Sequence, residues 1–419
     1  MNGVPSLRVP QCHAQLYRKF LETKGVLDLK YCMQKYPDGT VTLPLQSSIL
    51  PQLDLPALQY AIAPDSTCEI VHIQVPQLSK KARAKSCVDK LVDALQELLA
   101  SHGEKWSEEL RKDIPQKWQR HGDLIMFGED CFRQTVWKKI GPGLWQAVAH
   151  GLGVKRLAQI KCISKDGYRS PVVTLVLGES SYVTHTDNHI RYEFDVTKCM
   201  FSFGNITEKL RIASFNCSGE TVVDLYAGIG YFTLPYLVHA GAAHVHACEW
   251  NPDAVAALQR NLHLNGVSDR CTVHQGDNRQ LTLQDVADRV NLGLIPSSKD
   301  GWPVACQLLR KDTGGVLHIH ENVTSVSCTA DQKNHSVTEL QRNTTLEYEQ
   351  DGENLNESTM SDMDAWKAWA GETANRIAAL LKDITGDQWR TNIQHIEHVK
   401  SYAPHINHIV LDLECRPLI

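Results

Sequence analysis

The sequence has no apolar run as long as the roughly 18 residues that a membrane-spanning helix needs. Its first 16 residues contain no apolar core of the kind that a secretion signal carries. The 13 cysteines are scattered singly, without a Cys-x-x-Cys pair, which indicates neither a disulfide framework nor a zinc site. We therefore expect a cytoplasmic protein with reduced thiols, no bound metal and no contact with a membrane.

The charge has no strong overall sign, since the formal net charge of the 419 residues is -5. Its distribution is uneven. Residues 111–213 hold 16 Lys and Arg against 10 Asp and Glu, a net charge of +6, whereas residues 324–364 have a net charge of -7. The basic region is compatible with a nucleic-acid partner and equally with an ordinary solvated surface.

The chain is long enough for two or three domains. Residues 1–112 are typical of a small α/β module with helices over 13–23 and 79–101, and residues 115–192 of an α+β module with a helix over 132–152 and a hairpin turn at Asp166-Gly167. From residue 193 to 419 strands and helices alternate, which predicts an α/β doubly wound sheet preceded by the smaller domains. We expect residues 323–362 to be a disordered acidic insertion. Segments 394–400 and 408–415 predict a hairpin that adds a terminal antiparallel strand.

A glycine turn follows the first strand of this last region. The apolar run Val222-Val223 ends at Asp224, and the chain continues as Leu-Tyr-Ala to Gly228 and Gly230. Glycine lets a backbone approach a ligand closely, and the helix that follows offers its N-terminus to polar or anionic groups. The pattern predicts a ligand-binding turn.

Polar residues follow two further strands. Glu249 lies 25 residues after Asp224, where a carboxylate can accept both hydroxyls of a ribose, or alternatively cap the helix before Pro252. Asp277 and Asn278 follow the third strand and can read an adenine, although a plain turn would use the same residues. Because parallel strands end at one sheet edge, we expect these residues to share a site.

A dinucleotide fold is the obvious alternative, but position 233 carries Thr where the third glycine of that motif belongs. The turn and the three strand-end acids together resemble class I (Rossmann-like) S-adenosylmethionine-dependent transferases. This resemblance implies S-adenosyl-L-methionine as co-substrate.

The segment 194–211, Phe-Asp-Val-Thr-Lys-Cys-Met-Phe-Ser-Phe-Gly-Asn-Ile-Thr-Glu-Lys-Leu-Arg, strongly resembles the family of tRNA (guanine-37 N1)-methyltransferases and the related tRNA wybutosine-synthesizing protein 2 family. The resemblance covers residues 115–419, and the N-terminal module also looks like vertebrate members of the second family. The cofactor contacts that it implies are Ser202, Lys209, Asp224, Gly228, Gly230, Glu249, Asp277 and Asn278.

The segment after the fourth strand separates the two families. The methyltransferases carry an Asn two residues before a Pro, whereas this chain has Leu294 before Pro296 and continues with Ser297. The resemblance therefore implies transfer of the 3-amino-3-carboxypropyl group to C7 of 4-demethylwyosine at position 37 of tRNA-Phe. It also makes Pro296 and Ser297 candidate substrate contacts.

Three residues near the end of the resembling segment are candidates for chemistry. Lys209 can hold the methionine carboxylate or an RNA phosphate, or can be a surface ion-pair partner. Glu208 is a candidate general base and equally a helix-capping residue. Arg211 is a second candidate for a phosphate or carboxylate contact.

An anticodon loop presents unstacked bases and phosphates. Candidate contacts are Lys117 and Arg120, with Trp118 and Trp137 as stacking or core residues. We expect a monomer. The pairs His244/His246 and His318/His320 lack a third ligand at suitable spacing, so we expect no zinc.

Two other functions stay open on the sequence. A guanine-37 N1-methyltransferase would act on the same tRNA position, but Leu294 and Ser297 argue against it. A non-catalytic tRNA-binding protein could keep the fold, although it would have no need of the glycine turn and the strand-end acids.

Overall fold

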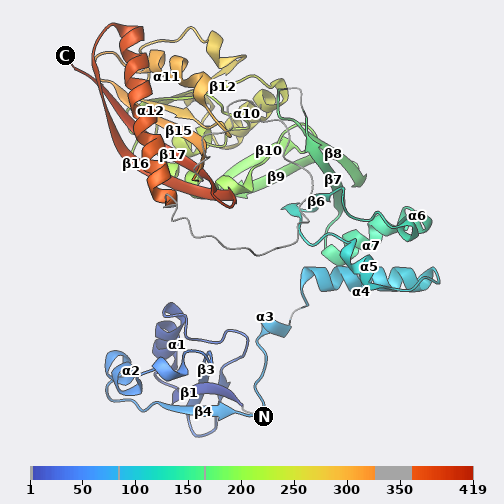
Figure 1. Cartoon of the computed structure of the whole chain (residues 1–419). Helices are drawn as coiled ribbons and strands as arrows, with labels where there is room; N and C mark the ends of the chain where they lie inside the picture. Colours follow the sequence, from blue (N-terminus) through green and yellow to red (C-terminus); the bar gives the residue numbers. More distant parts are fainter. Residues whose placement is uncertain (1–2, 84, 165–166, 326–360, 419) are drawn as a thin grey trace, which may run out of the picture. The chain divides into compact units, whose positions relative to one another are not determined.

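The computed structural model describes residues 3–83, 85–164, 167–325 and 361–418 (Figure 1). The chain forms two compact units. Unit 1 consists of Met1–Lys112 and Gln134–Gly153, and unit 2 of Asp113–Arg133 and Val154–Ile419. Residues 134–153 thus group with the N-terminal unit, although in the sequence they lie within the second expected segment.

Unit 1 contains a four-stranded sheet and several helices. The strand order is β2-β3-β1-β4, for β1 (Val4–Pro10), β2 (Gln34–Lys35), β3 (Thr40–Pro44) and β4 (Glu69–Ile73). The helices are α1 (Ala14–Thr23), α2 (Leu55–Ile62), α3 (Lys80–Arg83), α4 (Cys87–Ser101), α5 (Glu108–Lys112), α6 (Thr135–Ile140) and α7 (Gly143–Leu152). Helices α4 and α7 pack closely, because a Cβ on Gly151 would lie 2.9 Å from the Cα of Leu91.

Two helices of this unit are shorter than the sequence pattern indicated. The helix expected over 79–101 is two helices, because Ser86 is extended and accepts a hydrogen bond from the Asp89 N–H at 3.0 Å as the N-cap of α4. The helix expected over 132–152 is interrupted at Gly141, whose φ is +71°, and Pro142. The helical spacing of apolar residues continues through both breaks, so the sequence pattern did not mark them.

Unit 2 is built on a seven-stranded sheet in the order β13-β12-β11-β14-β15-β17-β16. The strands are β11 (Thr221–Asp224), β12 (His244–Glu249), β13 (Cys271–Gln275), β14 (Arg289–Leu292), β15 (Gly315–Thr324), β16 (Trp389–Ala403) and β17 (Ile406–Pro417). Strands β11 to β15 are parallel, and β17 pairs antiparallel with both β15 and β16. The predicted doubly wound sheet with a terminal antiparallel strand is confirmed.

Helices cover both faces of this sheet. They are α8 (Ile206–Ala213), α9 (Thr233–Val238), α10 (Pro252–Leu264), α11 (Trp302–Leu308) and α12 (Asp362–Thr385). One apolar core joins α9 and α10 to the sheet, and a second joins α11 and α12 to it. Figure 1 shows α12 lying along β15, β16 and β17.

Unit 2 also holds a smaller sheet and a hairpin. The smaller sheet has the order β5-β6-β7-β8, for β5 (Gln119–His121), β6 (Leu124–Gly128), β7 (Arg156–Ile163) and β8 (Pro171–Leu177). Strands β9 (Tyr182–Asp187) and β10 (Ile190–Asp195) pair as the hairpin, which packs on α10.

The expected insertion over 323–362 overlaps defined structure at both ends, since β15 runs to Thr324 and α12 begins at Asp362. Its interior, 326–360, lies outside the described residues, as does Asp166 of the expected hairpin turn. No helix in the described ranges has the length and apolar character to cross a membrane.

Candidate functional site

Asp224 supports the glycine turn from below. It is completely buried at the end of β11 and accepts hydrogen bonds from the Thr233 hydroxyl at 2.7 Å and the Asn291 amide at 3.0 Å. Burial raises the pKa of Asp224, and these two donors oppose the shift. The carboxyl group therefore connects β11, α9 and β14 and does not line the cavity above them.

Both glycines of the turn have positive φ, +56° at Gly228 and +101° at Gly230. A Cβ at Gly228 would lie 2.5 Å from the Tyr231 ring, so this backbone needs glycine for space as well as for conformation. Gly228 lines the cavity, whereas Gly230 packs against Leu234 beneath it.

Glu249 ties the second strand end to this turn. One carboxylate oxygen accepts the Gly228 N–H and the other the Asn251 N–H, both at 2.8 Å. Burial raises the pKa of Glu249, while the backbone donors lower it. Glu249 thus lies in the cavity wall, and it does not cap α10, because the N-cap is Asn251, whose side chain accepts the Asp253 N–H at 3.0 Å.

Asp277 and Asn278 lie at the end of the third strand and also line the cavity. The Asn278 amide donates to the Leu225 carbonyl at 2.8 Å, which holds it against the first strand end. Asp277 forms an ion pair with Arg279 at 2.6 Å. The strand-end acids thus meet at one sheet edge, as the parallel strands required.

The cavity has a volume of about 1000 Å³ and lies entirely within unit 2. Of the predicted site residues, those that line it are Ser202, Gly228, Glu249, Asp277, Asn278 and Arg120. Those that do not are Lys209, Asp224, Gly230, Glu208, Arg211, Lys117, Pro296 and Ser297. A carboxylate, an amide and the half-exposed ring of Trp250 beside a glycine cradle fit a nucleoside such as the adenosine of S-adenosylmethionine.

Residues 202–209, which lead into and form the first part of α8, lie partly in the cavity wall and partly in the protein interior. Residues from Ser202 to Asn205 line the cavity, and the Lys400 side chain lies against Gly204, where a Cβ would contact its Nζ. Farther along α8, Lys209 is buried, forms an ion pair with Asp187 and lies 4.7 Å above the Phe201 ring centre. In this structure the ammonium group faces the β9–β10 hairpin.

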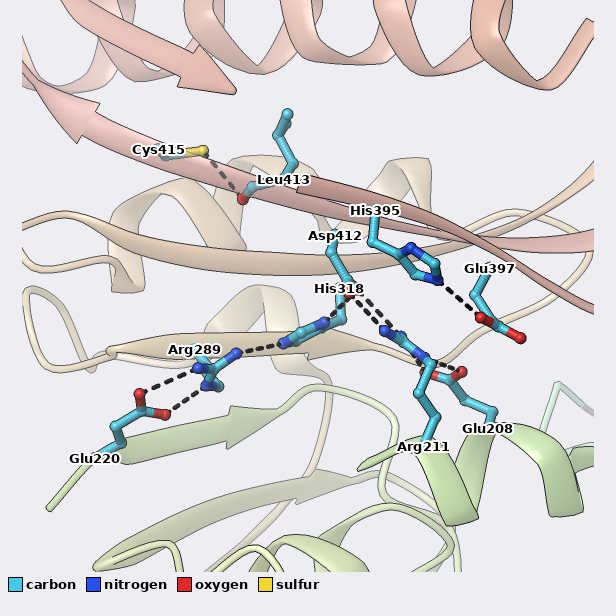
Figure 2. A network of polar contacts seen from close by, with 10 residues as sticks. All are labelled: Glu208, Arg211, Glu220, Arg289, His318, His395, Glu397, Asp412, Leu413 and Cys415. Atoms are coloured by element: carbon cyan, nitrogen blue, oxygen red, sulfur yellow. Dashed lines mark hydrogen bonds and ion pairs between the residues drawn. The ribbon is translucent and has the colours of Figure 1, made fainter. Parts of the chain in front are cut away.

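Glu208 and Arg211 belong to a buried polar network beneath the sheet (Figure 2). Arg211 donates to both oxygens of Glu208, at 2.8 and 2.7 Å, and also pairs with Asp412 on β17. Asp412 in turn contacts Nδ1 of His318 on β15 at 2.6 Å. Burial raises the pKa of Glu208 to about 7, although Arg211 opposes the shift.

The segment after β14 forms the opposite wall. Gly293, Leu294 and Ile295 line the cavity, whereas Pro296 accepts a backbone hydrogen bond from the Asn322 N–H at 2.8 Å. Ser298 is buried and donates to the His320 carbonyl at 3.1 Å. Strand β15 therefore fixes the segment in which Leu294 replaces the asparagine of the methyltransferases.

Sequence reasoning missed several cavity residues, among them Trp250, Arg169 and Lys400. Trp250 directly follows Glu249, so its position carried a signal. Arg169 comes from the loop between β7 and β8 and Lys400 from β16, and neither has a local pattern that indicates the cavity.

The candidate RNA contacts lie in different settings. Trp118 and Arg120 line the cavity and Lys117 is exposed outside it, whereas Trp137 is buried in unit 1. Among the paired histidines, His246 contacts His274 at 3.0 Å, and the described residues contain no cluster of three or more metal-ligating side chains.

The chain is similar to known proteins over its whole length. One family model, the TRM5/TYW2 methyltransferase domain, matches residues 183–346, and two models described as TYW2 N-terminal domain match residues 7–82 and 95–181. A tRNA wybutosine-synthesizing protein 2 homolog of Danio rerio is 66% identical over 421 residues, which covers both chains in full. The chain belongs to this family. The resemblance stated from residues 194–211 is confirmed.

Other members of the family agree. The homolog of Homo sapiens is 51% identical, over 96% of this chain and 92% of its own. The crystal structure of P. horikoshii TYW2 in complex with MeSAdo aligns with a TM-score of 0.53 at 25% identity, over 76% of this chain and 98% of that chain. Trm5b from Pyrococcus abyssi shares the fold, with a TM-score of 0.54 at 20% identity over 99% of both chains.

Proposed function

We propose that this protein transfers the 3-amino-3-carboxypropyl group of S-adenosylmethionine to C7 of 4-demethylwyosine at position 37 of tRNA-Phe. Methylthioadenosine leaves, and the product belongs to wybutosine biosynthesis. The observation that carries the proposal is the full-length similarity to tRNA wybutosine-synthesizing protein 2 homologs, joined to a cavity of the right character. The S-adenosylmethionine-dependent transferase chemistry follows from the same family.

The nucleoside end of the cavity has a role for each polar group. Glu249 would accept the ribose hydroxyls, and Asp277 and Asn278 would contact the adenine. Gly228 keeps the backbone close to the ligand, and Ser202 lies on the wall that leads to α8. When bound, S-adenosylmethionine supplies a sulfonium whose three attached carbons are electrophilic.

The choice among those carbons is a matter of position. Orientation of reacting atoms is worth several kcal/mol of barrier, so a changed pocket redirects the same cosubstrate. Leu294 gives the acceptor wall an apolar side chain where the methyltransferase relatives carry an amide. This difference supports transfer of the amino-acid arm in preference to the methyl group.

The catalytic roles of Glu208 and Lys209 and the substrate contact of Arg211 remain hypotheses. Each side chain has an internal partner and none lines the cavity. Their arrangement supports a positioning role, because they fix the helix that follows Ser202. The contacts of Pro296, Ser297, Lys117 and Arg120 with the acceptor are likewise proposed.

The proposed partner is the anticodon loop of tRNA-Phe, bound by a cytoplasmic monomer without a membrane. In this proposal residues 1–112 are a tRNA-related module, residues 115–192 position the RNA and residues 193–419 carry the reaction. Basic and aromatic residues of the cavity, such as Arg120 and Trp118, suit a flipped or unstacked base.

A labelling experiment tests the function. The protein is incubated with tRNA-Phe from cells blocked before this step and with S-adenosylmethionine labelled in the carboxyl or in the methyl carbon. We expect carboxyl label, and no methyl label, in the tRNA. Methyl label would instead support the guanine methyltransferase, and the absence of both labels would support a non-catalytic tRNA-binding protein.

A further inference from the structure

Arg169 joins the smaller sheet of unit 2 to the acceptor wall of the cavity. It lies just before β8, with φ of +56°, and both Arg169 and the preceding Tyr168 line the cavity. The Nη1 of Arg169 donates to the Ile295 carbonyl at 2.9 Å. The Tyr168 ring meets the Trp250 ring edge to face, with 6.0 Å between ring centres. The loop therefore contacts the nucleoside side and the acceptor side of one cavity.

The guanidinium brings a positive charge into this space. Within the described residues, Arg169 forms no ion pair with a carboxylate. Of the acids that line the cavity, Glu249 accepts two backbone N–H groups and Asp277 pairs with Arg279, and the third is Asp300. Arg169 is half-buried, and among the described residues its one protein acceptor is the Ile295 carbonyl, so guanidinium donors are left for an anion.

The contact with Ile295 also places hydrogen-bond donors on the acceptor wall. Arg169 donates to that carbonyl through Nη1, and its other guanidinium N–H groups add donors to the wall that Leu294 and Ile295 form. Such a wall suits a ligand rich in acceptor oxygens, and a planar guanidinium binds a carboxylate with two parallel hydrogen bonds.

The position of Arg169 favours an anion on the acceptor side of the cavity. Arg169 lines the same cavity as Gly228 of the glycine turn, and its Nη1 lies 2.9 Å from the Ile295 carbonyl in the segment after β14. The glycine turn and the segment after β14 are the two walls that would enclose a sulfonium and its arm.

We propose that Arg169 binds the carboxylate of the amino-acid arm of S-adenosylmethionine and thereby holds that arm toward the acceptor wall. The proposal rests on the proposed function and gives it a specificity-determining residue. A tRNA phosphate has similar chemistry, and the experiment distinguishes the two anions.

The test compares two ligands that share the adenosine part. S-adenosylmethionine carries the arm, and methylthioadenosine lacks it. Isothermal titration calorimetry measures the Kd of each for the full chain, for Arg169→Ala and for Arg169→Lys. Arg390→Ala, which removes an exposed arginine of β16 outside the cavity, is the matched control.

We expect Arg169→Ala to raise the Kd of S-adenosylmethionine by about 10- to 100-fold, as the loss of a charge-assisted hydrogen bond implies. The Kd of methylthioadenosine should change by less than about twofold, and Arg169→Lys should recover part of the affinity because it keeps the charge.

Four outcomes would overturn the proposal. Equal weakening of both ligands would mean that Arg169 only shapes the pocket. Unchanged binding of S-adenosylmethionine with weaker binding of tRNA would assign the residue to a phosphate. If the unaltered chain bound neither small ligand, the proposed function would fail and this inference with it, whereas normal turnover and affinity in Arg169→Ala would remove the inference alone.

Discussion

His121 is a buried histidine whose two ring nitrogens have no hydrogen-bond partner in the described part of the chain. Four rings surround it at centre-to-centre distances of 5.0 to 5.8 Å, those of His185, Phe194, Phe201 and Phe203. Burial, and to a smaller extent His185, lowers the pKa of His121 to about 4. The ring is therefore neutral in the folded protein under ordinary conditions and acts as an aromatic packing group.

This pKa predicts an acid-sensitive contribution to stability. Between the ordinary value of 6.5 and about 4, the unfolded chain carries the proton and the folded chain does not. The unfolded state binds more protons in this window, so folding stability falls as the pH is lowered through it. His121→Leu should reduce the loss of unfolding free energy between pH 7 and pH 4.5 by about 1 kcal/mol or more, measured by urea unfolding.

The control for this measurement is His150→Leu, the same substitution at an exposed histidine of α7. An identical pH slope in His121→Leu and the unaltered chain would contradict the assignment of a neutral buried ring.

At the scale of single residues, the sequence predicted the polar residues that follow the strands at the cavity and missed those that reach it from other elements. Glu249, Asp277 and Asn278 each follow an apolar strand directly, so local pattern and parallel topology were enough to bring them together. Arg169 meets Ile295 across 126 residues of sequence, and Lys400 reaches Gly204 from a different strand. Contacts of this kind are fixed by packing between sheets, which no local pattern records.

At the scale of elements, buried polar contacts connect α8 to strands β15 and β17 of the sheet. Arg211 on α8 pairs with Asp412 on β17, and Asp412 also holds His318 on β15 (Figure 2). Although burial alone would raise it, the contacts with His318 and Arg211 lower the pKa of Asp412 well below its usual range. One carboxylate therefore joins three elements and stays charged.

Removal of this carboxylate should be costly. Asp412→Ala leaves the buried His318 without its carboxylate partner and removes one of the two carboxylates that pair with Arg211, and we expect a loss of about 3–5 kcal/mol in the free energy of unfolding. The S-adenosylmethionine Kd should rise as well, because α8 carries the wall that begins at Ser202. Urea unfolding and calorimetric titration measure the two effects.

Glu414→Ala is the matched control on the same strand. Glu414 pairs with Arg416 at 3.0 Å near the surface, so its loss should cost less than about 1 kcal/mol. Equal costs at the two positions would show that the buried network does not stabilise the fold more than a surface ion pair does.

The strand ends were more predictable than the helix limits. Asp224 and Glu249 end β11 and β12, and Asp277 follows β13, as expected, since a buried parallel strand is apolar throughout. Helix α11 ends at Leu308, because Leu309 is extended. Such an end depends on tertiary packing, whereas the helix period continues past it.

At the scale of the whole molecule, the association of residues 134–153 with residues 1–112 separates sequence order from spatial order. The chain leaves unit 1 at Lys112, returns at Gln134 and leaves again after Gly153. The sequence pattern divides the chain into consecutive segments, so it does not show that residues 134–153 pack with the N-terminal unit. This packing includes the close contact of Gly151 with Leu91.

Binding of tRNA by this acidic chain should depend strongly on salt. The formal net charge is -5, yet residues 111–213 carry +6, which favours that region for attraction to phosphates. We expect the tRNA-Phe Kd to rise at least about tenfold between 50 and 200 mM salt, because released counterions drive such binding. Fluorescence anisotropy of labelled tRNA measures the change.

Methylthioadenosine, which is uncharged, provides the internal control over the same salt range, and its Kd should stay nearly constant. A tRNA affinity independent of salt would rule out phosphate contacts by this region.

Strand β17 lies inside the sheet, between β15 and β16, although it follows both in the sequence. During synthesis the ribosome therefore delivers Arg211 and His318 well before Asp412, the residue that joins them. A nascent chain that ends before Asp412 already contains Asp224, Glu249 and Asp277. Its helix α8, which follows Ser202, still lacks the carboxylate with which Arg211 pairs. A frameshift near residue 400 would then abolish the cosubstrate site even though the glycine turn, Glu249 and Asp277 had all been translated correctly.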